Sequence, residues 1–276
     1  MALQATGLTD VGLGAGLTTN FQVQYESTLP NRANVVANAN ALLAVLENEF
    51  VVTTGWFNTP GGKFGTGQRQ IVNLNLPDNS GANNAGSGSA INTDAQSGNG
   101  NAADAAERVK MLFMNEWVEI LMSLTQGKWN AGDSIGEGLS QYCGIVRFPA
   151  GHYSYYGSFV NQWLNQAPRP DFVKTTKPTD KDPVSFGCAL AFLFYLNSQL
   201  NFTINQILAA GAPTLATVYQ TLTGKNVDPF PDFLHQIRTA YPGTSTITGP
   251  NPDNPYPLGK NIAWHNSSTN ETQIWF

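Results

Sequence analysis

Polar and hydrophobic positions alternate in two short stretches near the start of the chain. Phe21 to Tyr25 and Gln70 to Leu76 each place apolar side chains on one face, which is typical of half-buried strands. Between them, Ala33 to Phe50 carries apolar residues at three- and four-residue spacing, which predicts an amphipathic helix. We expect Gly55 to end that helical region.

The segment Pro77 to Gly100 is dominated by Asn, Gly, Ser and Ala. Such a composition is typical of a flexible linker between subdomains. The alternative is an ordered loop that runs along a cleft and contains a short strand, Ser89 to Thr93. We favour the ordered loop, because Ala90 and Ile91 interrupt the polar run and unstructured loops of this length are uncommon inside compact domains.

The strongest helical pattern covers Asp104 to Leu124. Asp104 followed by Glu107 matches a capping box, so Asp104 is the expected N-cap. From Met111 to Leu124 nearly every position is apolar, and a helix that is apolar on all sides is a core helix. Further helices are predicted from near Glu137 and over Ser185 to Gln199, Thr203 to Ala210, Thr214 to Thr221 and Pro231 to Ala240.

These elements predict an α+β protein with a small N-terminal sheet region followed by a mostly helical C-terminal half. We expect a single domain over residues 1–276. Within it, residues 1–100 form a subdomain of strands and loops, residues 101–242 form a helical subdomain, and residues 243–276 form an irregular, proline-containing tail.

Charge and cysteine content narrow the classes of function. The net charge is −5 and only 12% of residues are charged, so no basic surface for nucleic acid is expected. No apolar run reaches the ~20 residues that a bilayer requires, so membrane insertion is not expected. We expect the first residues not to be a signal peptide, while three Asn-x-Ser/Thr sequons favour an extracellular or secreted protein. Cys143 and Cys188 are expected to be buried thiols.

Three polar residues interrupt the core helix: Asn115, Glu116 and Glu119. We expect them to be buried or to face an internal cleft, with Asn115 and Glu119 on one face because they are four residues apart. An unpaired buried carboxylate is costly, so each must be paired, protonated or bound to a metal ion.

The spacing of these residues resembles that of a metallopeptidase family. Asn115-Glu116-Trp117-Val118-Glu119 occupies the place of a His-Glu-x-x-His helix, and Gly136-Glu137-Gly138-Leu139-Ser140-Gln141-Tyr142 resembles the Glu-Gly-x-x-x-Tyr segment of gluzincin peptidases. The helix Gly187 to Leu193 and the segment Leu222 to Lys225 are similar to the basic-secretory-protein peptidases. The resemblance covers roughly Val109 to Ile237 and implies a zincin-like fold.

The resemblance implies a role for each matching position. Asn115 and Glu119 stand where the two histidine ligands would be, Glu137 matches the third metal ligand, and Glu116 matches the catalytic general base. Both histidines are therefore replaced, and the remaining set is all oxygen. Zinc prefers imidazole or thiolate, so zinc is not expected, whereas Ca²⁺, Mg²⁺ or Mn²⁺ would suit these ligands, or no metal at all.

Two further features border this predicted site. His152 heads a tyrosine cluster and, with Tyr153 and Tyr156, is a candidate for the cleft, although a histidine packed beside aromatic rings is the favoured interpretation. Asp133 either caps the helix that carries Glu137 or adds an oxygen ligand, and capping is favoured.

Three classes of function follow from the sequence. The first is a non-catalytic binding protein with a degenerate peptidase site that takes a peptide, protein or glycan ligand. The second is a hydrolase that uses an oxygen-ligated metal and Glu116 as general base. The third is a structural or assembly protein. The binding protein ranks first, because loss of both imidazoles removes the Lewis acid on which the peptidase reaction depends, so whether the chain is an enzyme stays open.

Overall fold

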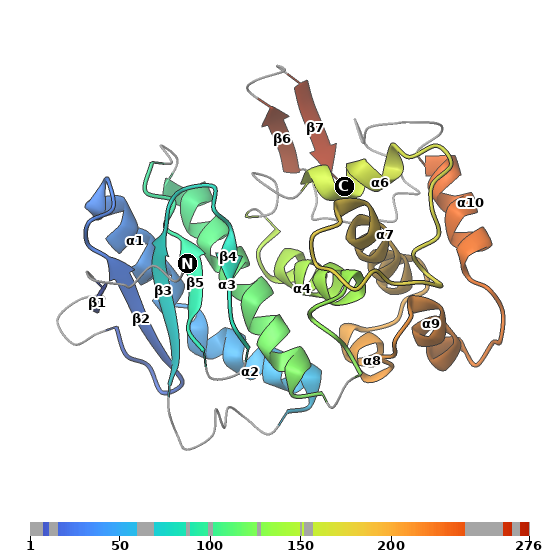
Figure 1. Cartoon of the computed structure of the whole chain (residues 1–276), viewed down its shortest axis with the longest axis horizontal. Helices are drawn as coiled ribbons and strands as arrows, with labels where there is room; N and C mark the ends of the chain where they lie inside the picture. The colour runs from blue at the N-terminus through green and yellow to red at the C-terminus, as the bar shows by residue number, and fades with distance from the viewer. Residues whose placement is uncertain are drawn as a thin grey trace. The chain divides into compact units, whose positions relative to one another are not determined.

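The computed structural model describes residues 8–10, 16–59, 69–86, 89–98, 102–125, 128–149, 151, 157–240, 262–266 and 271–275. Contacts divide the chain into two compact units, residues 1–121 and residues 122–276. The fold class is α+β, as predicted, with a small mixed sheet in the first unit and mostly helices in the second (Figure 1).

The sheet of the first unit contains the two predicted strands and three others. Its order is β1 (Leu8–Asp10), β2 (Phe21–Glu26), β3 (Gln70–Leu76), β5 (Ile91–Asp94) and β4 (Ala82–Asn83). Strands β2, β3 and β5 are parallel, whereas β1 and β4 run antiparallel at the two edges. Apolar residues such as Val23, Val72 and Leu74 are fully buried, as the alternation predicts.

Helices cover the apolar face of this sheet. They are α1 (Arg32–Leu43), α2 (Leu46–Phe57) and α3 (Ala102–Ser123). The ring of Phe21 on β2 lies 6.0 Å from Phe50 of α2, and 5.6 and 5.3 Å from Phe113 and Trp117 of α3, in edge-to-face arrangements. Such contacts add to the burial of large apolar surfaces, so this aromatic cluster joins both helices to the sheet.

Several predicted boundaries are wrong. The helix expected over Ala33 to Phe50 is two helices with a 46° bend at residues 44–45, and Leu42 and Leu46 on either side of the bend are both buried. Gly55 lies inside α2, which ends at Asn58 in a left-handed conformation. The strand expected at Ser89 to Thr93 begins two residues later. Asp104 is not the N-cap, since α3 begins at Ala102 and Asp104 lies in its first turn.

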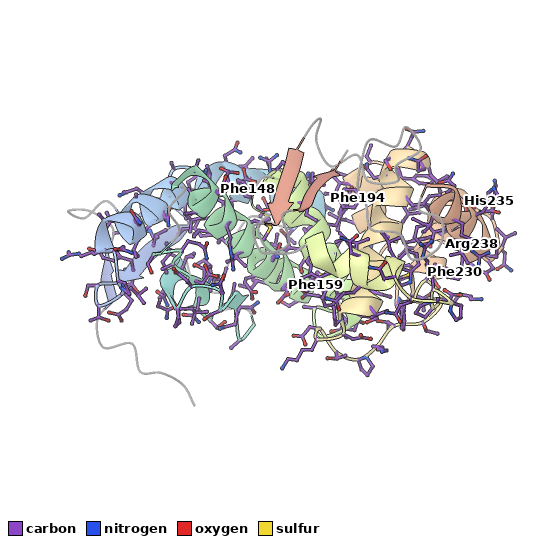
Figure 2. The ribbon with its side chains drawn as sticks, turned by 90° about the horizontal axis from the view of Figure 1, so that it is seen from above. Phe148, Phe159, Phe194, Phe230, His235 and Arg238 are labelled. Atoms are coloured by element: carbon purple, nitrogen blue, oxygen red, sulfur yellow. The ribbon has the colours of Figure 1, made fainter. Side chains whose placement is uncertain are left out.

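The second unit is built around one apolar helix, α7 (Pro183–Phe194), which continues as the π-helix η1 (Tyr195–Gln199). It packs against α4 (Ser134–Arg147) and α6 (Gly157–Leu164). The remaining helices are α8 (Ile204–Ala209), α9 (Leu215–Thr223) and α10 (Phe230–Ala240). The ring centroid of Phe194 lies 4.8 Å from that of Tyr142 on α4. The exposed His235 lies on α10, as do Phe230 and Arg238 (Figure 2).

Three further predictions concern the two cysteines, the C-terminal tail and membrane insertion. Cys143 and Cys188 are free, buried thiols, as expected, and burial raises the pKa of each. The predicted irregular tail contains a hairpin of β6 (Ile262–Asn266) and β7 (Glu271–Trp275). None of the helices in the described ranges is long and apolar enough by itself to cross a membrane. Among the helices of these described ranges, the bent pair α1 and α2 passes that test of length and composition when taken together.

Candidate functional site

The middle of α3 is as buried as its apolar sequence predicts. Met111 to Val118 are all buried, and the indole N–H of Trp117 donates a 2.9 Å hydrogen bond to the hydroxyl of Thr53 on α2. The end of the predicted core segment is different, because Ser123 and Leu124 are exposed. The helix therefore stays in the core as far as Met122, and the exposed positions begin at its last residue, Ser123.

The polar residues of α3 are buried to different degrees. Asn115 and Glu116 are 4% and 9% exposed, as expected for residues in a core helix, whereas Glu119 is only half-buried. We expected Asn115 and Glu119 to act together. A contact also joins Glu116 and Glu119, which are three residues apart and therefore neighbours on the helix surface as well.

Asn84 is the residue that joins them. It directly follows the edge strand β4, and its side-chain amide donates hydrogen bonds of 2.8 Å to Glu116 Oε2 and 3.0 Å to Glu119 Oε2. The side-chain oxygen of Asn84, Oδ1, accepts a 2.8 Å hydrogen bond from the backbone N–H of Gly86. One neutral amide thus donates to two carboxylates, which reduces the cost of placing like charges side by side.

The loop that carries Asn84 is fixed at a second point on α3. Arg108 and Asp94 form a 2.9 Å ion pair, and their side chains are 4% and 0% exposed. Arg108 also donates to the side-chain oxygen of Asn79, while Asp94 accepts from Gln96 and from the backbone N–H of Gly81. Burial raises the pKa of Asp94, and the charge of Arg108 opposes that rise.

These contacts explain why the Asn- and Gly-rich segment is ordered. Asn79, before β4, accepts a hydrogen bond from Arg108 near the start of α3. Asn84, after β4, donates to Glu116 and Glu119 further along the same helix. The short strand favoured for Pro77 to Gly100 is present as β5, and the course of this segment along a cleft stays a prediction. Sequence reasoning did not find Asn84, since nothing in that segment distinguishes it from the neighbouring asparagines.

Glu137 belongs to the second unit, in the first turn of α4. Its carboxylate accepts a 2.6 Å hydrogen bond from the side chain of Gln141, one helical turn further on. Asp133 caps this helix, as favoured, by accepting from the backbone N–H groups of Ile135 and Gly136. The convergence of Asn115, Glu119 and Glu137 on one point remains a prediction.

The remaining candidates concern metal binding and the tyrosine cluster. Within the described ranges, no three His, Cys, Asp or Glu side chains are grouped closely enough to hold a metal ion. Glu116 and Glu119 supply oxygen only, which suits hard cations better than zinc. His152, Tyr153 and Tyr156, the other predicted cleft residues, lie outside the described residues.

We expect the Asn84→Ala substitution to lower the free energy of unfolding by about 1–3 kcal/mol, because two carboxylates lose a hydrogen-bond donor. Urea denaturation at neutral pH measures this loss. Asn83→Ala is the matched control, since the side chain of Asn83 is exposed and, among the described residues, accepts a hydrogen bond from the Asn92 side chain alone. Equal losses in the two variants would show that the contact with Glu116 and Glu119 contributes nothing.

Comparison of the chain with models of known protein families and with curated proteins finds no match.

Proposed function

We propose that this chain is a metallopeptidase-like binding protein, of zincin type, that holds an extended peptide along β4 without cleaving it. The observation that carries the proposal is the bridge from Asn84 to Glu116 and Glu119. It places the two carboxylates of the degenerate motif at the end of an edge strand, where a bound peptide would meet them.

The backbone of β4 supports a peptide ligand. The N–H of Asp94 donates to the carbonyl of Gly81, so this pair is hydrogen-bonded and the next pair, Ala82 and Thr93, is not. In such a pair the backbone groups point away from the partner strand, so the N–H and carbonyl of Ala82 face outward from the sheet. An extended peptide can pair with these groups as an added strand.

The environment of Glu116 supports binding rather than hydrolysis. A general base must accept a proton from the attacking water, but one carboxylate oxygen of Glu116 already accepts from Asn84 at 2.8 Å. The two positions where the resemblance would require imidazole ligands hold Asn115 and Glu119 instead. Glu116 therefore serves to fix the loop, and the half-buried Glu119 presents negative charge to a ligand.

Two proline substitutions in β4 test the peptide site. The N–H of Ala82 faces outward, so Ala82→Pro should keep the melting temperature within a few degrees and reduce peptide binding at least tenfold. The N–H of Asn83 faces β5, so Asn83→Pro should lower both binding and the melting temperature.

Binding is measured with a tryptic digest of unfolded casein, whose retained peptides are identified by mass spectrometry and then titrated singly. Retention by Ala82→Pro at the wild-type level would exclude strand pairing at β4. Absence of any retained peptide on the wild type would exclude the proposed function.

A further inference from the structure

A cavity of about 260 Å³ lies in the second unit, and its lining shares no residue with the proposed peptide site. Trp129, Ile135 and Pro213 supply apolar surface, whereas Asp133, Asn130 and Lys128 supply polar groups. All the lining residues belong to the described part of the chain. The volume is slightly below the ~300–1,000 Å³ of typical sites for drug-sized ligands, so one small ring fits better than an oligomer.

The apolar wall of the cavity is rigid. Trp129 is almost fully buried, and its indole N–H donates a 3.0 Å hydrogen bond to the carbonyl of Leu208. Gly211 packs against the same ring so closely that an added Cβ would lie 2.3 Å from the indole nitrogen. A side chain held in this way does not lose further freedom when a ligand binds, which favours recognition.

The polar groups of the cavity are also held in place, and they retain hydrogen-bonding capacity. Asp133 uses Oδ1 to cap α4, and Asn130 uses Oδ1 to accept from the backbone N–H of Gly132. Within the described ranges, no hydrogen bond uses Oδ2 of Asp133 or Nδ2 of Asn130. The cavity thus offers one acceptor and one donor beside an aromatic wall.

Charge balance indicates which ligand fits. Lys128 and Asp133 are the charged side chains among the lining residues, and their charges cancel. A phosphate or carboxylate would be attracted by Lys128 but repelled by Asp133, and the reverse holds for a simple cation, so neither gains net attraction. A neutral ring with hydroxyl groups at its edge and C–H groups on its face matches the polar groups and the indole wall together.

We infer that this cavity binds a single neutral sugar ring, with Asp133 and Asn130 bonded to its hydroxyls beside the apolar lining of Trp129, Ile135 and Pro213. The inference does not rest on the proposed peptide site, because no residue is shared.

The test is a titration of the whole chain with small molecules. Binding is measured by isothermal calorimetry and by the chemical shift of the Trp129 indole N–H. The probes are D-glucose, D-galactose, D-mannose and N-acetylglucosamine, with L-serine as a zwitterion of similar size. We expect at least one sugar to bind saturably at millimolar concentration and to shift the indole signal, and L-serine not to bind.

Two variants locate the binding. Asp133→Asn keeps a good N-cap but removes the charged acceptor, so affinity should fall about tenfold while the melting temperature is retained. Ala212→Leu should abolish binding by filling the cavity. Asp182→Asn is the matched control, since Asp182 caps α7 in the same way and lies outside the cavity, so it should bind sugar normally.

Three results would overturn the inference. They are the absence of saturable binding by all four sugars, tighter binding of L-serine than of any sugar, and an equal loss of affinity in Asp133→Asn and Asp182→Asn.

Discussion

Replacement of Arg108 by Met is expected to lower the free energy of unfolding by about 3–5 kcal/mol at neutral pH. The substitution leaves the carboxylate of Asp94 buried without its cation, and breaking a buried ion pair from one side is among the most destabilising changes known. Because the same pair fixes the loop before β4, peptide binding should be lost with stability. Chemical denaturation of wild type and variant measures the first effect directly.

The pH dependence of this loss has a definite sign. Burial already raises the pKa of Asp94, and removal of the opposing charge of Arg108 raises it further. An acid whose folded pKa lies above its unfolded value, ~3.9 for Asp, destabilises the fold increasingly as pH rises from that value through the folded pKa. The deficit of Arg108→Met should therefore be smaller at pH 5 than at pH 8.

Two further variants isolate the ion pair. The double variant Asp94→Asn, Arg108→Met should recover much of the lost stability, since neither partner is then charged. Lys110→Met is the control on the same helix, because Lys110 pairs with Glu107 at a more exposed position and should cost less than about 1 kcal/mol. Equal losses for Arg108→Met and Lys110→Met would contradict this account of the loop.

Replacement of Gly136 by Ala is expected to cost about 3 kcal/mol. Gly136 lies in the first turn of α4, and an added Cβ would lie 1.9 Å from the backbone oxygen of Asn130, a distance that no side-chain adjustment relieves. Relief requires a backbone shift, and overpacking of this kind typically costs ~1–3 kcal/mol or more. The same shift would move the cap Asp133 and the wall of the cavity that we infer to bind a sugar.

Gly55→Ala is the matched substitution in the first unit. Gly55 is exposed inside α2, and an added Cβ meets nothing within 4 Å. Because Ala is the better helix former, this variant should gain about 0.5–1 kcal/mol. Thermal and urea denaturation of both variants give the comparison. A Gly136→Ala variant as stable as wild type would mean that the start of α4 is not packed as closely as the structure indicates.

The parts of the fold that sequence predicted well depend on local periodicity. β3 was predicted with its observed ends, and α3 within two residues, because each has a long and regular pattern of apolar positions. The break between α1 and α2 escaped prediction because neither Gly nor Pro marks residues 44–45 and the apolar spacing continues through them. β4 was not predicted because a strand of two residues is too short to show an alternation of apolar and polar positions.

The candidate site was predicted only as far as helix burial allows. The apolar run around Asn115 and Glu116 indicated that both are buried, and they are. Asn84 lies 32 residues before Glu116 in the chain, so its contact depends on how β4 is placed against α3. That placement follows from the pairing of β4 with β5 and from the buried pair Asp94 and Arg108, which periodicity does not reveal.

The most direct test of the central claim is mass spectrometry of a peptide after prolonged incubation with the chain. A casein peptide that the wild type retains is incubated with an excess of protein, separately with chelator, Ca²⁺, Mn²⁺ and Zn²⁺. A binding protein whose Glu116 and Glu119 are held by Asn84 should return the peptide intact under every condition. Cleavage products that appear with wild type and disappear in Glu116→Gln would contradict that claim and identify Glu116 as the base of an active hydrolase.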